Sequence, residues 1–166
     1  MRTFAYYWGI GGVILVIGSA VWRLTPRVLE LRQHELAVWE WLLLGAFVLF
    51  MLYSEGYKGF HLNFAPRVVV RAKGLMQSGR PLLYLLAPLV CMGYLYATRK
   101  RQIISVLITS AIVLLVIGVR MLPQPWRGIV DAGVVAGLGM GTLSIVWFWL
   151  RQDLLGLSPD IPADLP

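Results

Sequence analysis

The segment from residue 54 to 75, SEGYKGFHLNFAPRVVVRAKGL, concentrates ionisable side chains in a chain that is otherwise largely apolar. A carboxylate and an imidazole can exchange protons with a substrate, so Glu55 and His61 could serve as an acid and a base. A guanidinium binds phosphate or carboxylate through paired hydrogen bonds, so Arg67 and Arg71 could hold an anionic substrate or lipid headgroup. The candidate functional cluster of the sequence is Glu55, Lys58, His61, Arg67 and Arg71.

The same segment also fits a purely structural role. If a short helix starts near Asn63, one of its faces is apolar and carries Val68, Val69, Ala72 and Leu75. A short basic helix of this kind lies in the membrane interface and contacts lipid phosphates. Because the ionisable residues have no motif-specific spacing, we favour a lipid-contacting anchor over a reaction centre.

The two histidines, His34 and His61, raise the question of a metal or haem site. The apolar run 36–53 separates them, and if it crosses a membrane they emerge on opposite faces, about 30 Å apart. One metal ion then cannot bind both, and Cys91 is the only cysteine, so no cysteine pair supplies further ligands. We therefore expect no metal and no cofactor.

Glu40 is an ionisable residue within an apolar run, which makes it a functional candidate because a charge in lipid is costly. It could couple the protein to a proton or another cation. However, Trp39 and Trp41 flank it, and tryptophan favours the headgroup level of a membrane, where water reaches the carboxylate. We favour solvation at this level and keep the coupling role as the alternative.

Arg120 and Asp131 lie at matching distances from the ends of the proline-rich turn 123–128. In an antiparallel hairpin they would lie at the same depth on neighbouring helices, where an ion pair would let both enter the edge of the hydrocarbon region. Arg127 competes as a partner because it precedes Asp131 by four residues, one helical turn. We expect a structural role for this pair.

The run 129–150 carries a GxxxGxxxG ladder that consists of Gly133, Gly137 and Gly141. Small residues at every fourth position flatten one helix face and allow another backbone to approach closely. Intramolecular packing, homodimerisation and docking onto a larger complex all remain open, and intramolecular packing is the commonest of the three.

Recognisable catalytic motifs are absent from the sequence. It contains no GxGxxG fingerprint, no P-loop, no HExxH pair and no serine in a nucleophile elbow. Whether the protein is an enzyme stays undecided, although the absence of these motifs favours a non-enzymatic role.

Five apolar runs organise the chain. Each is close to the roughly 20 residues that a helix needs to cross about 30 Å of hydrocarbon. Helix is the expected conformation, because an isolated strand would leave its backbone groups unpaired in lipid. Tryptophan and tyrosine near the ends of the runs support these boundaries. The predicted membrane spans cover residues 5–22, 36–53, 81–98, 103–122 and 129–150.

The composition supports a membrane location. Hydrophobic residues make up 58% of the chain and charged residues only 14%, whereas a soluble domain has roughly a quarter of its residues charged. The net charge of +7 does not indicate nucleic-acid binding, because the basic residues form short clusters between apolar runs, as they do beside membrane spans.

The predicted spans form one membrane domain, residues 1–150, which includes the basic interfacial segment 54–80. Residues 151–166 form an acidic, proline-rich tail that we expect to be loosely ordered. Five spans place the two termini on opposite sides of the membrane. The basic residues then divide eight to seven between the sides, so the positive-inside rule leaves the orientation undecided.

The sequence thus predicts an all-α, polytopic helix bundle in the cell membrane, with five spans and short interfacial helices. We expect a small non-enzymatic protein that contacts lipids and associates through its helices, as an accessory or oligomerising component. Its partners would be membrane lipids, with a second copy or a larger membrane complex as further alternatives. The alternative function is a transporter or membrane enzyme that acts on an ion or lipid headgroup through Glu40 or Glu55 and through Arg67 and Arg71.

Overall fold

The computed structural model describes residues 2–77 and 81–162, and these ranges contain helices and connecting turns but no strand. The described residues include four helical stretches that are long and apolar enough to cross a membrane. The protein is therefore an all-α helical membrane protein with four candidate spans, and the predicted number of five is wrong. The four stretches are Thr3–Gln33, Val38–Met76, Arg99–Arg120 and Trp126–Leu155.

The second candidate span is longer than predicted. Instead of ending near Tyr53, the 39-residue stretch Val38–Met76 continues through the basic segment without a break. It consists of α2 (Val38–Met51), a π-helix η2 (Leu52–Phe64) and α3 (Ala65–Gln77). The basic segment is thus the continuation of a long helix, where we had expected a separate element on the membrane surface.

The apolar face predicted for this segment exists, but protein covers it. Val68, Val69, Ala72 and Leu75 are all 0% exposed and belong to the main hydrophobic core. The same core contains residues of α1 (Arg2–Glu30), among them Ile10 and Val13. Burial of these side chains against another helix leaves no apolar face of α3 for the membrane surface.

The predicted span 81–98 is broken into two short helices, neither of which can cross a membrane. They are α4 (Pro81–Leu85) and α5 (Ala87–Met92). Pro88 lies near the start of α5, where its fixed φ angle and missing N–H are tolerated, whereas within a long helix they would interrupt the hydrogen-bond ladder. Gly93 then ends α5 in the left-handed conformation, with φ of +85°.

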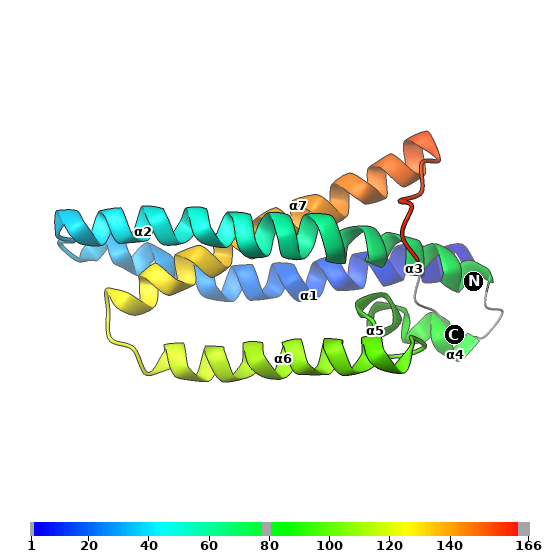
Figure 1. The fold of residues 1–166 in the computed structure, drawn as a ribbon, viewed down its shortest axis with the longest axis horizontal. Helices are drawn as coiled ribbons and strands as arrows, with labels where there is room; N and C mark the ends of the chain where they lie inside the picture. Colours follow the sequence, from blue (N-terminus) through cyan, green and yellow to red (C-terminus); the bar gives the residue numbers. More distant parts are fainter. Residues whose placement is uncertain (1, 78–80, 163–166) are drawn as a thin grey trace.

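The last two helices follow the prediction more closely. They are α6 (Arg99–Arg120) and α7 (Trp126–Leu155), which a turn at 121–125 connects. In Figure 1, α1, α2 and α7 run together, whereas α6 lies along one side, with α5 near its N-terminal end. The core of the molecule lies between α1, α3, α5 and α7.

The loss of one span brings both ends of the described chain to the same end of the bundle (Figure 1). At this end, which we call the terminal end, the Tyr7 hydroxyl donates a hydrogen bond of 3.2 Å to Asp153 Oδ2. At the opposite end, which we call the turn end, the amide of Gln124 contacts Glu30 and the backbone of Arg27. The predicted placement of the termini on opposite sides is therefore wrong.

Cysteine labelling in sealed vesicles tests this four-span topology. Gln33 lies at the turn end and Lys100 at the terminal end, so we expect a membrane-impermeant maleimide to label Gln33→Cys and Lys100→Cys from opposite faces. Labelling of both from one face would instead support five spans. Native Cys91 is completely buried, and this burial raises the pKa of its thiol to about 12, so its background reaction is slow.

Candidate functional site

The glycine ladder of α7 receives the helix formed by α2 and η2. A Cβ atom added to Gly133 would lie 2.5 Å from the ring of Phe47, and one added to Gly141 would lie 2.5 Å from the ring of Phe60. Between them, a Cβ on Gly137 would lie 3.3 Å from the Cβ of Glu55. The ladder therefore lies against a helix of the same chain, with rings packed where a Cβ on Gly133 or Gly141 would be and a closer fit than usual at Gly137.

The π-helix explains how two distant aromatic rings reach the same face of α7. Phe47 and Phe60 are thirteen residues apart, which corresponds to about 3.6 turns of a regular α-helix and would direct their side chains to opposite faces. The wider turns of η2 take up more residues per turn, so both rings meet the ladder. The same shift brings His61 beside α7.

His61 is held between η2 and α7. Its Nδ1 lies 3.1 Å from the Ser144 hydroxyl, and its ring contacts Tyr57 and Phe148. The Ser144 hydroxyl donates its single proton to the backbone carbonyl of Met140, at 2.9 Å. While it does so, it can only accept from His61, whose Nδ1 then carries the proton. In this arrangement His61 cannot act as a base that activates Ser144 as a nucleophile.

The other acidic and basic residues of η2 point elsewhere. Glu55 lies near Gly137 of α7 and makes no hydrogen bond or ion pair with another described residue. Lys58 lies over the ring of Tyr53, with its Nζ 4.8 Å from the ring centre, and it does not pair with Glu55. Glu55 and His61 do not form an acid and base pair in this structure, because Glu55 lies near Gly137 of α7 and His61 contacts Ser144, two turns further along.

Arg71 is the most deeply buried ionisable side chain of the cluster, only 1% exposed. Its Nη1 donates a hydrogen bond of 3.3 Å to the backbone carbonyl of Cys91, near the C-terminus of α5. Ser105 of α6 donates to the next carbonyl, that of Met92, at 3.2 Å. A cation at a helix C-terminus satisfies free carbonyls and interacts favourably with the helix dipole, so Arg71 holds α5 in place.

Gly93 allows the Arg71 guanidinium to approach the end of α5, because a Cβ at this position would lie 2.5 Å from Arg71 Nη1.

Arg67, one turn earlier on α3, is partly buried. Arg71 thus faces α5 and α6, whereas Glu55 and His61 face α7. The structure does not bring the five residues of the predicted cluster together around one cavity.

Glu40 has a local role at the start of α2. Its Oε2 accepts a hydrogen bond of 2.8 Å from the backbone N–H of Ala37, one of the groups that a helix N-terminus leaves unpaired. A carboxylate in the first helical turn is also favoured by the helix dipole. The geometry thus places Glu40 as a capping residue near the turn end.

Asp131 pairs with Arg127 and not with Arg120. Arg127 Nε lies 3.8 Å from Asp131 Oδ2, an ion-pair distance that is too long for a hydrogen bond. Asp131 is buried, whereas Arg120 is exposed at the end of α6. The expected pair fails because α6 and α7 do not pack as a tight hairpin, so the competing partner one turn before Asp131 takes its place.

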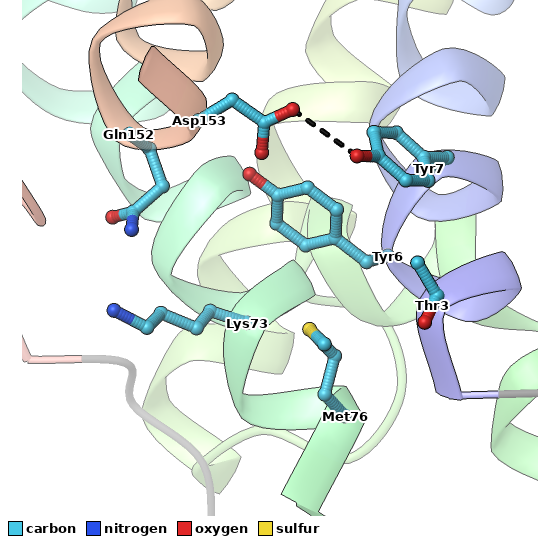
Figure 2. Close-up of a pocket in the computed structure, with 7 residues that line it drawn as sticks. All are labelled: Thr3, Tyr6, Tyr7, Lys73, Met76, Gln152 and Asp153. Atoms are coloured by element: carbon cyan, nitrogen blue, oxygen red, sulfur yellow. Dashed lines mark hydrogen bonds between the residues drawn. The ribbon is translucent and has the colours of Figure 1, made fainter. Parts of the chain in front are cut away.

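The structure also contains a small pocket, lined mostly by residues with polar groups, that the sequence did not indicate. It has a volume of about 150 Å³ and lies at the terminal end, between α1, α3 and the end of α7 (Figure 2). Its lining residues are Thr3, Tyr6, Tyr7, Lys73, Met76, Gln152 and Asp153. We refer to it as the tyrosine pocket. A second, more open groove of about 430 Å³ lies beside His61 and Ser144 and is otherwise lined by apolar side chains.

The tyrosine pocket could not be found from the sequence because its residues come from three distant segments. From the sequence, Tyr6 and Tyr7 are predicted to be interfacial anchors of the first span, and Asp153 is predicted to belong to the tail. A five-span topology separates these groups by the full thickness of a membrane. Only the four-span arrangement places Tyr7 and Asp153, which are 146 residues apart in sequence, within hydrogen-bonding distance.

Metal binding gains no support from the described residues, which contain no group of three or more His, Cys, Asp or Glu side chains that could hold a metal ion. His34 lies exposed between η1 (Leu31–Gln33) and α2, apart from His61.

No family model, curated protein or solved structure matches this chain. The fold itself defines the class, a small multi-pass helical membrane protein.

Substitution of two neighbouring glycines tests the packing of the ladder. We expect Gly141→Ala to lower the free energy of unfolding by about 1–3 kcal/mol, because its Cβ would overlap the ring of Phe60. A Cβ on Gly139 meets nothing within 4 Å, so Gly139→Ala should be neutral or stabilising through its higher helix propensity. Thermal unfolding in one detergent compares the two variants, and equal melting temperatures would contradict this packing.

Removal of the Arg71 guanidinium tests its role in holding α5. We expect Arg71→Met to lower the free energy of unfolding by about 1.5–3 kcal/mol, the usual worth of a charge-assisted hydrogen bond. It should also speed maleimide labelling of Cys91, because α5 loosens and exposes the thiol. Arg120→Met is the matched control, since Arg120 is exposed. Unchanged Cys91 labelling in Arg71→Met would show that α5 is held by other contacts.

Proposed function

We propose that this chain is a non-enzymatic accessory membrane protein that associates with a partner through α6. The observation that supports this proposal is the exposure of α6, in which every residue from Val106 to Gly118 is exposed. This stretch covers roughly three and a half helical turns, so every face of the helix is largely exposed. The three other long helices, in contrast, pack against one another.

α6 is attached to the rest of the molecule mainly near its N-terminal end. Ser105 bonds to the backbone of Met92, and the Thr109 hydroxyl meets that of Tyr94. Beyond Thr109 the helix has no hydrogen bond to another described element. Because lipid provides little hydrophobic driving force between helices, close packing holds membrane bundles together. A helix that lacks such packing within its own chain is available for a partner.

The charges of α6 favour a different protein over a second copy as this partner. The helix begins with Arg99, Lys100 and Arg101, ends with Arg120, and contains no acidic residue. Two copies with the same orientation in a membrane would bring these basic ends to the same level, where like charges repel. A partner helix with acidic residues at its ends would complement them.

A transporter or enzyme based on the predicted cluster receives less support from the geometry. Neither the tyrosine pocket nor the groove beside His61 is lined by Glu40 or Glu55. The Arg71 guanidinium is bonded to the end of α5, and the Glu40 carboxylate is bonded to the backbone at the start of α2. A polar cavity that reaches both carboxylates would favour this function, and these two pockets do not provide one.

The four-span arrangement also removes the balance of basic charge between the two sides. Lys58 lies near the middle of the stretch Val38–Met76, and of the other described basic residues eight lie towards the terminal end: Arg2, Arg67, Arg71, Lys73, Arg99, Lys100, Arg101 and Arg151. Five lie towards the turn end: Arg23, Arg27, Arg32, Arg120 and Arg127. By the positive-inside rule, the terminal end would face the cytoplasm. A cytoplasmic terminal end would direct the basic start of α6 towards anionic lipids and cytoplasmic-side partners.

Photo-crosslinking in native membranes tests the association through α6. A benzophenone side chain at Ile112 or Leu115 of α6 is expected to give a discrete adduct with a second protein, whereas the same group at Leu42, an exposed position of α2, should react with lipid. Reversal of the basic triplet, in Arg99→Glu, Lys100→Glu and Arg101→Glu together, should remove the adduct. Mass spectrometry of the adduct identifies the crosslinked chain.

Three results would count against this proposal. Equal, lipid-only products at the α6 and α2 positions would mean that α6 simply faces the bilayer. An adduct between two copies of this chain would contradict the charge argument and would support homo-oligomerisation instead. An adduct that persists after reversal of the triplet would show that the basic end of α6 does not select the partner.

A further inference from the structure

The tyrosine pocket contains buried polar groups that have no partner within the described part of the chain. Tyr6 is only 5% exposed, and its hydroxyl lies beside the Asp153 carboxylate without a hydrogen bond of regular geometry. Figure 2 shows this hydroxyl directed towards the Asp153 carboxylate, with the Gln152 amide farther to one side. The side-chain Oε1 of Gln152 is also buried and unpaired. Because an unpaired buried polar group costs about 1–3 kcal/mol, two such groups on residues that line one pocket point to a ligand that pairs with both.

The charges around the pocket restrict the chemistry of this ligand. The Asp153 carboxylate accepts a hydrogen bond from Tyr7, and each carboxylate oxygen can accept more than one, so it retains capacity for another donor. The Tyr6 and Tyr7 rings add aromatic faces, which attract cations. Together with the unpaired Gln152 oxygen, these groups would suit a primary ammonium, which carries a positive charge and three N–H donors.

Lys73 lines the same pocket and makes a simple cation or anion a poorer fit. Its Nζ donates a hydrogen bond of 2.7 Å to the Ser158 hydroxyl, which leaves two further N–H donors. A lone cation would be repelled by this ammonium, and a lone anion would be repelled by Asp153. A zwitterion that carries a phosphate beside a primary ammonium matches both charges, because lysine is a common phosphate ligand.

The position of the pocket points to a lipid as the source of this group. Tyrosine pairs near the end of a span favour the headgroup level of the membrane, and the pocket lies at the terminal end of the bundle, bordered by α1 and α7. Its volume of about 150 Å³ suits a small polar group and not an acyl chain. The acyl chains of a lipid would remain in the bilayer beside the helices.

We propose that the tyrosine pocket binds the phosphoethanolamine headgroup of an aminophospholipid, with Asp153, Tyr6 and Gln152 on the ammonium and Lys73 on the phosphate. This site is independent of the association through α6, since the two involve different residues. The N–H donors are decisive for recognition. A choline headgroup has the same charges but three methyl groups in place of the N–H donors, so it cannot satisfy the unpaired oxygens.

Lipid retention by the full chain tests this site. The purified protein is mixed in detergent with phosphatidylethanolamine, phosphatidylcholine or phosphatidylglycerol, and native mass spectrometry measures the bound lipid. We expect preferential retention of phosphatidylethanolamine. Tyr6→Phe removes only the hydroxyl and should weaken retention about 2- to 10-fold, whereas Asp153→Asn removes the charge and should weaken it about 10- to 100-fold. The matched controls Tyr53→Phe and Asp160→Asn lie outside the pocket and should change nothing.

Free phosphoethanolamine separates the two sources of the headgroup. If millimolar phosphoethanolamine leaves the bound lipid in place, the ligand is the membrane lipid, and if it displaces the lipid, the pocket also takes the soluble compound. Equal retention of phosphatidylethanolamine and phosphatidylcholine would overturn the proposal. It would also be overturned if the preference survived both Tyr6→Phe and Asp153→Asn, or if phosphatidylglycerol bound best and only Lys73→Gln weakened it.

Discussion

The bond between the Arg71 guanidinium and the end of α5 is the contact on which the arrangement of the whole chain depends. It holds a buried charge against backbone carbonyls that a longer helix would have paired internally. With α5 ended at Gly93, the chain turns and starts α6 from the terminal end. Had the segment 81–98 crossed the membrane, α6 and α7 would run in the opposite direction. The position of the C-terminal tail therefore depends on how the segment 81–98 folds.

The packing of α7 against the second span is the other constraint, and it acts by shape instead of charge. The ladder of Gly133, Gly137 and Gly141 offers three shallow positions, and rings from α2 and η2 occupy the outer two. A regular α-helix could not place both rings there, so the π-helix reconciles the spacing of one helix with that of the other. Gly56 takes part from the opposite side, because a Cβ there would lie 2.8 Å from the sulfur of Met140.

These two constraints separate the ionisable residues that lie close together in sequence. Along one continuous helix, His61 turns to α7, Lys58 to the ring of Tyr53, and Arg71 to α5. Residues far apart in sequence come together instead, as Tyr7 and Asp153 do at the terminal end. Polar groups in this protein thus hold helices to each other, and two buried groups without a partner, the Tyr6 hydroxyl and the Gln152 side-chain oxygen, belong to residues that line the tyrosine pocket. Chemical function is better sought between helices than within one charged segment.

The sequence by itself determined the class of the protein and most of its helices, because lipid requires each segment to satisfy its own backbone hydrogen bonds. Apolar length and aromatic anchors located the runs at 103–122 and 129–150 correctly. The spacing of Val68, Val69, Ala72 and Leu75 also predicted the apolar face of α3, but placed it at the membrane surface, whereas the structure buries it in the core. Only the tertiary structure decided whether 81–98 crosses the membrane. Its hydropathy allows a span, and the outcome depends on Pro88, on Gly93 and on an arginine of another helix. The tyrosine pocket also depends on the tertiary structure, because its residues come together only when the chain crosses the membrane four times.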